Sequence, residues 1–160
     1  MHAAPRRCAV AIRTVTTPPH SDLVTDGIRV RAAAEFVPDE SDPAKPSYVF
    51  GYRIVMTNEG DQSATLEARH WTIVDANGRR SEVRGAGVVG EFPTLHPGDQ
   101  FEYSSRCPLT TSWGSMEGSY RFRRPDGTRF DASVGRFFLA MNAPPIAQQL
   151  ARDEQPTSAP

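Results

Sequence analysis

Cysteine, lysine and long apolar runs are all scarce in this chain of 160 residues. The two cysteines, Cys8 and Cys107, lie far apart, which excludes a CxxC motif and a disulfide framework within one domain. No apolar run approaches the roughly 18 residues of a membrane-spanning helix. The apolar stretch from Cys8 to Ile12 is also shorter than the about 7–15 residues of a secretion signal. We therefore expect a cytoplasmic protein with no membrane partner.

An excess of positive charge is also missing. The formal net charge is −1, and Lys45 is the single lysine among 18 basic residues. A protein that binds nucleic acid through its overall charge would need a basic balance or a concentrated basic patch. The composition therefore predicts no nucleic-acid partner.

Helical periodicity is nearly absent, and apolar and polar residues instead alternate with a period of two. Alternation of this kind is typical of β-strands with one buried face. The pattern predicts about seven antiparallel strands over residues 28–34, 48–58, 64–74, 79–83, 100–106, 118–124 and 128–139.

Turn-forming residues separate these segments. Asn77-Gly78 predicts a hairpin between two neighbouring strands, and Pro125-Asp126-Gly127 predicts another before the last strand. Seven short strands in one domain fit a β-sandwich or a closed barrel. The immunoglobulin pattern of two core cysteines around a tryptophan is missing, so Trp71 is expected to pack without a disulfide beside it.

Residues that could carry catalysis or bind a metal are isolated. The four histidines have no zinc-ligand spacing, and no cysteine pair supplies further ligands. The acidic loop at residues 39–42 offers oxygen ligands for magnesium but lacks the spacing of a calcium loop, so a solvated turn is preferred. In the segment Gly114–Gly118, Met116 holds the place that a nucleophilic serine would need. We expect no catalytic residue, no metal site and no cofactor.

A glycine-rich segment, Gly85-Ala86-Gly87-Val88-Val89-Gly90, matches the G-x-G-x-x-G spelling of dinucleotide-binding loops. The two prolines and one glycine that follow leave no room for the helix which that loop requires. Two interpretations stay open. Backbone amides could form a nest for a phosphate or pyrophosphate with Arg84, Gly85, Gly87 and Gly90, or the glycines could serve only the backbone path, which we prefer.

Partner binding is the alternative to chemistry. Exposed edge strands can accept a partner strand. The segment at residues 88–95 contains four apolar residues, Val88, Val89, Phe92 and Leu95. They either pack over the core or form an exposed recognition patch, and we prefer packing over the core. Homodimerisation through sheet edges or through these loops is left open by the sequence.

Several spaced segments resemble one known family. RHWTIVDANG, EVRGAGVVG, PTLHPGDQFEYSS and GSMEGSYRF occur in the order seen in the bacterial ApaG proteins, and SDPAKPSYVFGYRIVMTN resembles their first strand pair. The resemblance covers about residues 22–144. It implies an immunoglobulin- or fibronectin III-like β-sandwich, an association with cobalt and magnesium resistance, and no established catalytic activity. It also decides between sandwich and barrel in favour of the sandwich.

The sequence thus predicts an N-terminal tail at residues 1–21, an ApaG-like domain at residues 22–144 and a C-terminal tail at residues 145–160, with both tails disordered. The expected function is that of a non-enzymatic binding module for an unidentified protein partner, with an influence on divalent cation tolerance. The alternative is a protein that binds a pyrophosphate-containing ligand or a nucleotide through the segment Gly85–Gly90.

Overall fold

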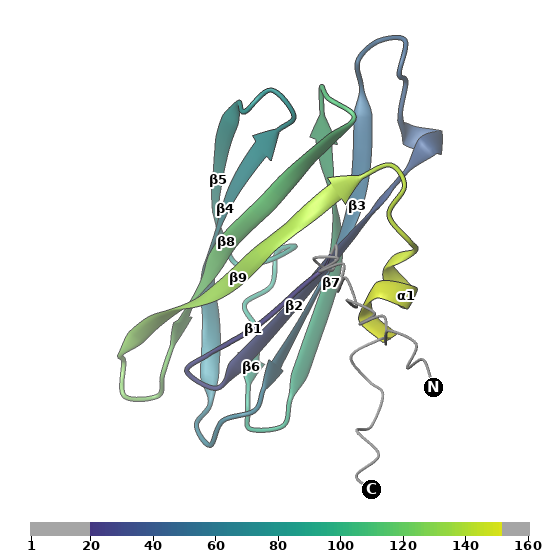
Figure 1. Ribbon diagram of the computed structural model, residues 1–160. Helices are drawn as coiled ribbons and strands as arrows, with labels where there is room; N and C mark the ends of the chain where they lie inside the picture. Colours follow the sequence, from purple (N-terminus) through teal and green to yellow (C-terminus); the bar gives the residue numbers. More distant parts are fainter. Residues whose placement is uncertain (1–19, 152–160) are drawn as a thin grey trace, which may run out of the picture.

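In the part of the chain that the structure describes, nine β-strands form two antiparallel sheets packed face to face (Figure 1). The computed structural model describes residues 20–151. The strands are β1 (Ser21–Thr25), β2 (Ile28–Phe36), β3 (Tyr48–Asn58), β4 (Ala64–Asp75), β5 (Arg80–Ala86), β6 (Thr94–Leu95), β7 (Gln100–Leu109), β8 (Trp113–Arg123) and β9 (Arg129–Ala140). A short 3-10 helix, η1 (Pro38–Glu40), and one α-helix, α1 (Ile146–Ala151), complete the elements.

The first sheet has the order β1-β2-β3-β7, and the second has the order β5-β4-β8-β9, with β6 pairing with the start of β4. At one side of the sandwich β1 and β2 pack against β9. The predicted all-β sandwich is confirmed. The seven predicted strands correspond to β2–β5 and β7–β9, while β1 and β6 are additional.

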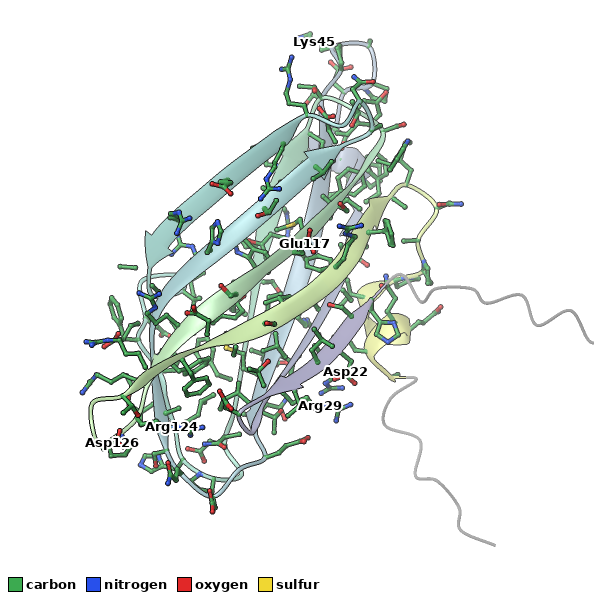
Figure 2. The ribbon with its side chains drawn as sticks, turned by 60° about the vertical axis from the view of Figure 1, so that its left-hand side comes forward. Asp22, Arg29, Lys45, Glu117, Arg124 and Asp126 are labelled. Carbon is green, nitrogen blue, oxygen red and sulfur yellow. The ribbon has the colours of Figure 1, made fainter. Side chains whose placement is uncertain are left out.

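The additional strand β1 pairs with β2 through a tight turn at Asp26-Gly27, where both residues have positive φ (47° and 83°). These values define a type I′ hairpin turn, for which Asp-Gly is a favoured pair. Across the two strands the Arg29 Nε donates to the Asp22 carboxylate at 2.8 Å, and Figure 2 labels both residues. This hydrogen bond lowers the pKa of Asp22 below its usual value. The ion pair therefore supports an edge strand that the alternation pattern did not reveal.

Aromatic rings fill the space between the sheets. The Trp71 ring lies 5.7 Å from that of Tyr52, 5.8 Å from that of Tyr120 and 5.9 Å from that of Phe137, measured between centroids. Edge-to-face rings at such distances attract beyond the effect of burial alone. As predicted, Trp71 packs without a disulfide, because Cys107 is a free, buried thiol whose pKa burial raises to about 11.

A polar contact between two tyrosines joins the sheets within the core. The hydroxyl groups of Tyr103 on β7 and Tyr120 on β8 lie 2.5 Å apart and form a hydrogen bond. Burial raises the pKa of both phenols, so both hydroxyls stay protonated at neutral pH. Because buried hydroxyls without a partner are costly, this pair fixes how the two sheets lie on each other.

The segment after β9 corrects one expectation. Disorder was expected from residue 145, but residues 146–151 form α1, which packs on β2. Leu150 is 8% exposed and packs with Ala33 and Val55. The Gln149 side-chain amide donates to the Ala34 carbonyl at 2.8 Å. The helix is therefore held by contacts with the sheet, which the proline- and glutamine-rich composition concealed.

The remaining predicted tail residues, 1–19 and 152–160, lie outside the described part of the chain. No helix within residues 20–151 is long and apolar enough to cross a membrane.

Candidate functional site

The glycine-rich segment ends in a tight turn at the tip of β5. The Val88 N–H donates to the Glu91 carbonyl at 2.9 Å, and the Glu91 N–H donates to the Val88 carbonyl at 2.8 Å. Between them, Val89 has a φ of 44° and Gly90 a φ of 78°. Two consecutive residues with positive φ make this a type I′ turn. We call the residues Gly87–Phe92 the loop tip.

The loop tip splits the apolar residues of this region into two groups. Val88 is fully buried and Leu95 is 2% exposed, so both belong to the core. Val89 and Phe92 are 61% and 56% exposed. The sequence presented packing over the core and an exposed apolar patch as alternatives. The structure shows both within one short segment.

The predicted anion-binding residues occupy two different settings. Arg84 and Gly85 lie within β5, opposite β4, whereas Gly87 and Gly90 lie in the loop tip with positive φ. A nest needs successive backbone N–H groups that point at one anion. The Gly87 N–H instead donates to the Glu67 carbonyl at 2.9 Å, and the Val88 N–H donates to the Glu91 carbonyl within the turn. This geometry favours the backbone role of the glycines over the nest.

The side chain of Arg69 contacts the backbone at Gly85 and Gly87, a role that the sequence did not reveal. Its Nη1 donates to the carbonyls of Ala86 (3.0 Å) and Gly87 (2.8 Å). A β-carbon on Gly85 would lie 2.6 Å from the Arg69 guanidinium carbon. The arginine side chain therefore crosses β5 over Gly85 and fixes the start of the loop tip. No spacing in the sequence signals this contact, since it depends on the register of β4 and β5.

A shallow groove of about 370 Å³ lies beside this contact, on the outer surface of the second sheet. Its charges are mixed. The Arg121 Nε lies 3.2 Å from the Asp131 carboxylate, and the His70 Nε2 lies 3.7 Å from the Glu82 carboxylate. Arg84 has neither an ion pair nor a hydrogen bond with any described residue. Of the two groove arginines that form no ion pair within residues 20–151, Arg69 is held by the Ala86 and Gly87 carbonyls, and Arg84 has no such contact.

The segment Gly114–Gly118 lies within strand β8, whose register with β9 shifts between Met116 and Gly118. Ser115 and Gly118 are both part of β8, so no strand-to-helix elbow is formed there. A β-carbon on Gly118 would approach the His70 carbonyl oxygen to 2.0 Å, which shows that this glycine permits close contact between β8 and β4.

The acidic loop is engaged in contacts within the protein. The Arg106 Nε donates to the Glu40 carboxylate at 2.7 Å, and the Asp42 carboxylate accepts from the Ala44 N–H at 3.1 Å. Among residues 20–151, no group of three or more His, Cys, Asp and Glu side chains is placed to hold a metal ion.

Comparison with known sequences matches residues 38–124 to the ApaG domain. The protein ApaG of Aromatoleum aromaticum is 54% identical over 71% of this chain and 90% of its own length. The protein ApaG of Anaeromyxobacter dehalogenans is 48% identical over 76% of this chain and 95% of its own length.

A solved structure agrees with these sequence matches. The crystal structure of a Bordetella pertussis protein described as ApaA has 43% sequence identity with this chain and superposes with a TM-score of 0.71. The superposition covers 73% of this chain and 95% of the Bordetella chain.

Proposed function

This chain belongs to the ApaG family, and from that premise we propose that it is a non-enzymatic binding module whose ligand is another protein. The surface that it presents is the loop tip, with the exposed side chains of Val89 and Phe92 as the contact residues. We place this activity in the bacterial cytoplasm, with an effect on cobalt and magnesium tolerance exerted through the bound partner.

The observation that carries this proposal is the backbone of Val89. Its φ of 44° is rare for a β-branched residue and costs of order 1–3 kcal/mol. Asn, Asp or Gly would suit this place in a type I′ turn better. The valine nevertheless holds a side chain that is 61% exposed to water. Because the strained backbone exposes an apolar side chain instead of burying it, we attribute this arrangement to recognition.

The loop tip is also held rigidly. Val88 anchors it in the core, Arg69 binds the Gly87 carbonyl at 2.8 Å, and the Leu66 N–H donates to the Pro93 carbonyl at 2.9 Å. A surface that is already ordered loses little conformational entropy when a partner binds. Exposed apolar side chains on a fixed turn are therefore suited to act as anchors in a partner pocket.

The acidic loop offers a less suitable route to divalent cations. Its Glu40 carboxylate forms an ion pair with Arg106, and the positive charge of that arginine opposes a cation at the same carboxylate. The proposal therefore assigns the effect on cation tolerance to the partner.

We expect the substitution Val89→Asn to stabilise the fold while weakening partner binding. Relief of the backbone strain should raise the free energy of unfolding by about 1 kcal/mol. Loss of the apolar side chain should weaken binding at least about fivefold, or roughly 1 kcal/mol. Urea denaturation measures the first effect, and quantitative affinity capture from the source bacterium, compared protein by protein with the wild type, measures the second.

The matched control is Val24→Asn on β1, where the valine is also more than half exposed. This control should leave the captured proteins unchanged. Equal capture by wild type and by Val89→Asn would contradict the proposal, whatever the effect on stability.

A further inference from the structure

Within residues 20–151, strand β5 has a hydrogen-bonded neighbour on one side only. It pairs with β4, and Figure 1 shows it at the outer edge of its sheet. Six of its seven residues are exposed. Val83 lies opposite Trp71 and therefore faces the same side of the sheet as that buried ring. Its side chain is nevertheless 41% exposed.

The hydrogen bonds at the two ends of β5 show which of its backbone groups point away from β4. The Asp75 N–H donates to the Arg79 carbonyl at 3.0 Å, and the Gly87 N–H donates to the Glu67 carbonyl at 2.9 Å. In an antiparallel ladder, hydrogen-bonded and non-hydrogen-bonded pairs alternate. The odd-numbered residues of β5 therefore bond to β4. The N–H and C=O groups that point toward the open edge belong to Arg80, Glu82, Arg84 and Ala86, and of these the Ala86 carbonyl already accepts a hydrogen bond from the Arg69 Nη1 at 3.0 Å.

We infer that β5 pairs antiparallel with β5 of a second copy of this chain, around a two-fold axis at Val83. Val83 is the middle residue of the seven in Arg80–Ala86, so this register pairs the strand along its whole length. It also brings the outward-pointing backbone groups of both copies into register, as an antiparallel ladder requires. The contact is the same on both subunits and closes as a dimer.

The order of charges on β5 favours this register over its neighbours. Glu82 lies opposite the partner's Arg84, and Arg84 lies opposite the partner's Glu82, which gives two favourable cross-strand pairs. Moving the axis by one residue would place Glu82 against the partner's Glu82, or Arg84 against the partner's Arg84. Arg84, which has no ion pair or hydrogen bond with the described residues, acquires a counter-ion in the dimer.

Charged residues on an edge strand usually prevent sheet-to-sheet association. Here they disfavour the registers in which the axis moves by one residue. An axis at Ser81 would also pair Arg80 with the partner's Glu82, but it would join only residues 80–82 of the two strands, whereas the axis at Val83 joins all seven. On the inner surface, that axis brings Val83 against the partner's Val83 in a non-hydrogen-bonded pair, where side chains come closest. This contact reduces the exposure of the two valines.

A charge exchange tests the register. Glu82→Arg and Arg84→Glu should each weaken the dimer about tenfold, since each replaces two attractive pairs by two repulsive ones. The double variant Glu82→Arg/Arg84→Glu should recover the wild-type dissociation constant, measured by sedimentation equilibrium. Far-UV circular dichroism checks that each variant is folded. A double variant as weak as the single ones would overturn the inference, as would a wild-type protein that stays monomeric at every concentration.

Disulfide trapping tests the axis itself. In a Cys8→Ser background, Val83→Cys should give a covalent dimer upon mild oxidation, because the two thiols would meet at the axis. Val24→Cys on β1, an exposed edge valine in the other sheet, is the matched control and should give little dimer. Equal yields from both positions would overturn the proposed axis.

Discussion

Replacement of Trp71 with alanine is expected to lower the free energy of unfolding by about 3–5 kcal/mol. The indole is 3% exposed and its centroid lies within 6 Å of three other rings from both sheets. Its removal leaves a cavity that the rigid strands cannot close, so lost contacts add to lost burial. Urea denaturation followed by far-UV circular dichroism measures the change without depending on tryptophan fluorescence.

The second tryptophan provides the matched control. Trp113 begins β8 and is 51% exposed, so Trp113→Ala should change the free energy of unfolding by no more than about 0.5 kcal/mol. Similar losses for the two variants would contradict the assignment of Trp71 as the centre of the core.

Gly87→Ala is expected to lower the free energy of unfolding by at least about 2 kcal/mol. The φ of Gly87 is 60°, and an added β-carbon would lie 2.5 Å from the Glu91 carbonyl oxygen. The backbone of the loop tip would have to open, which would release Val88 from the core. Urea denaturation of the variant, with ¹⁵N-¹H spectra to locate the disturbance, measures this effect.

Gly90 belongs to the same G-x-G-x-x-G spelling and is the control. A β-carbon added to Gly90 would meet no other atom within 4 Å, and asparagine tolerates positive φ, so Gly90→Asn should cost less than about 1 kcal/mol. A large loss at Gly90 together with a small loss at Gly87 would contradict the backbone role derived from the turn. That outcome would instead support an anion-binding role for the segment Gly85–Gly90.

Much of the fold followed from local patterns in the sequence. The alternation over residues 48–58 matches the bounds of β3, and Asn77-Gly78 marks the turn between β4 and β5. Both signals depend only on neighbouring residues, because strand alternation and the positive φ of Gly78 are local properties. The likeness to immunoglobulin or fibronectin III domains stays a prediction.

The strand β1 could have been predicted, since Asp26-Gly27 is a favoured hairpin pair. For the helix α1 the spacing of Ile146 and Leu150 gave only a hint of one amphipathic turn, because Leu150 gains its burial from Ala33 and Val55, more than ninety residues earlier in the chain. Local composition there pointed to disorder instead.

The candidate site was harder to predict than the fold. The G-x-G-x-x-G spelling drew attention to the segment Gly85–Gly90, for which the sequence left an anion-binding nest open and favoured a backbone role. The exposure of Val89 beside the burial of Val88 depends on how the turn meets the core, and the position of Arg69 over Gly85 depends on strand register. Neither property is encoded in residue spacing.

Site-specific photo-crosslinking in living cells tests the binding proposal most directly. A benzoylphenylalanine residue placed at Val89 should give one discrete adduct of higher mass, while the same residue at Val24 should not. Phe92→Ser in the same chain should reduce that adduct. No adduct from position 89, or the same adducts from positions 89 and 24, would contradict the assignment of the loop tip as the partner-binding surface.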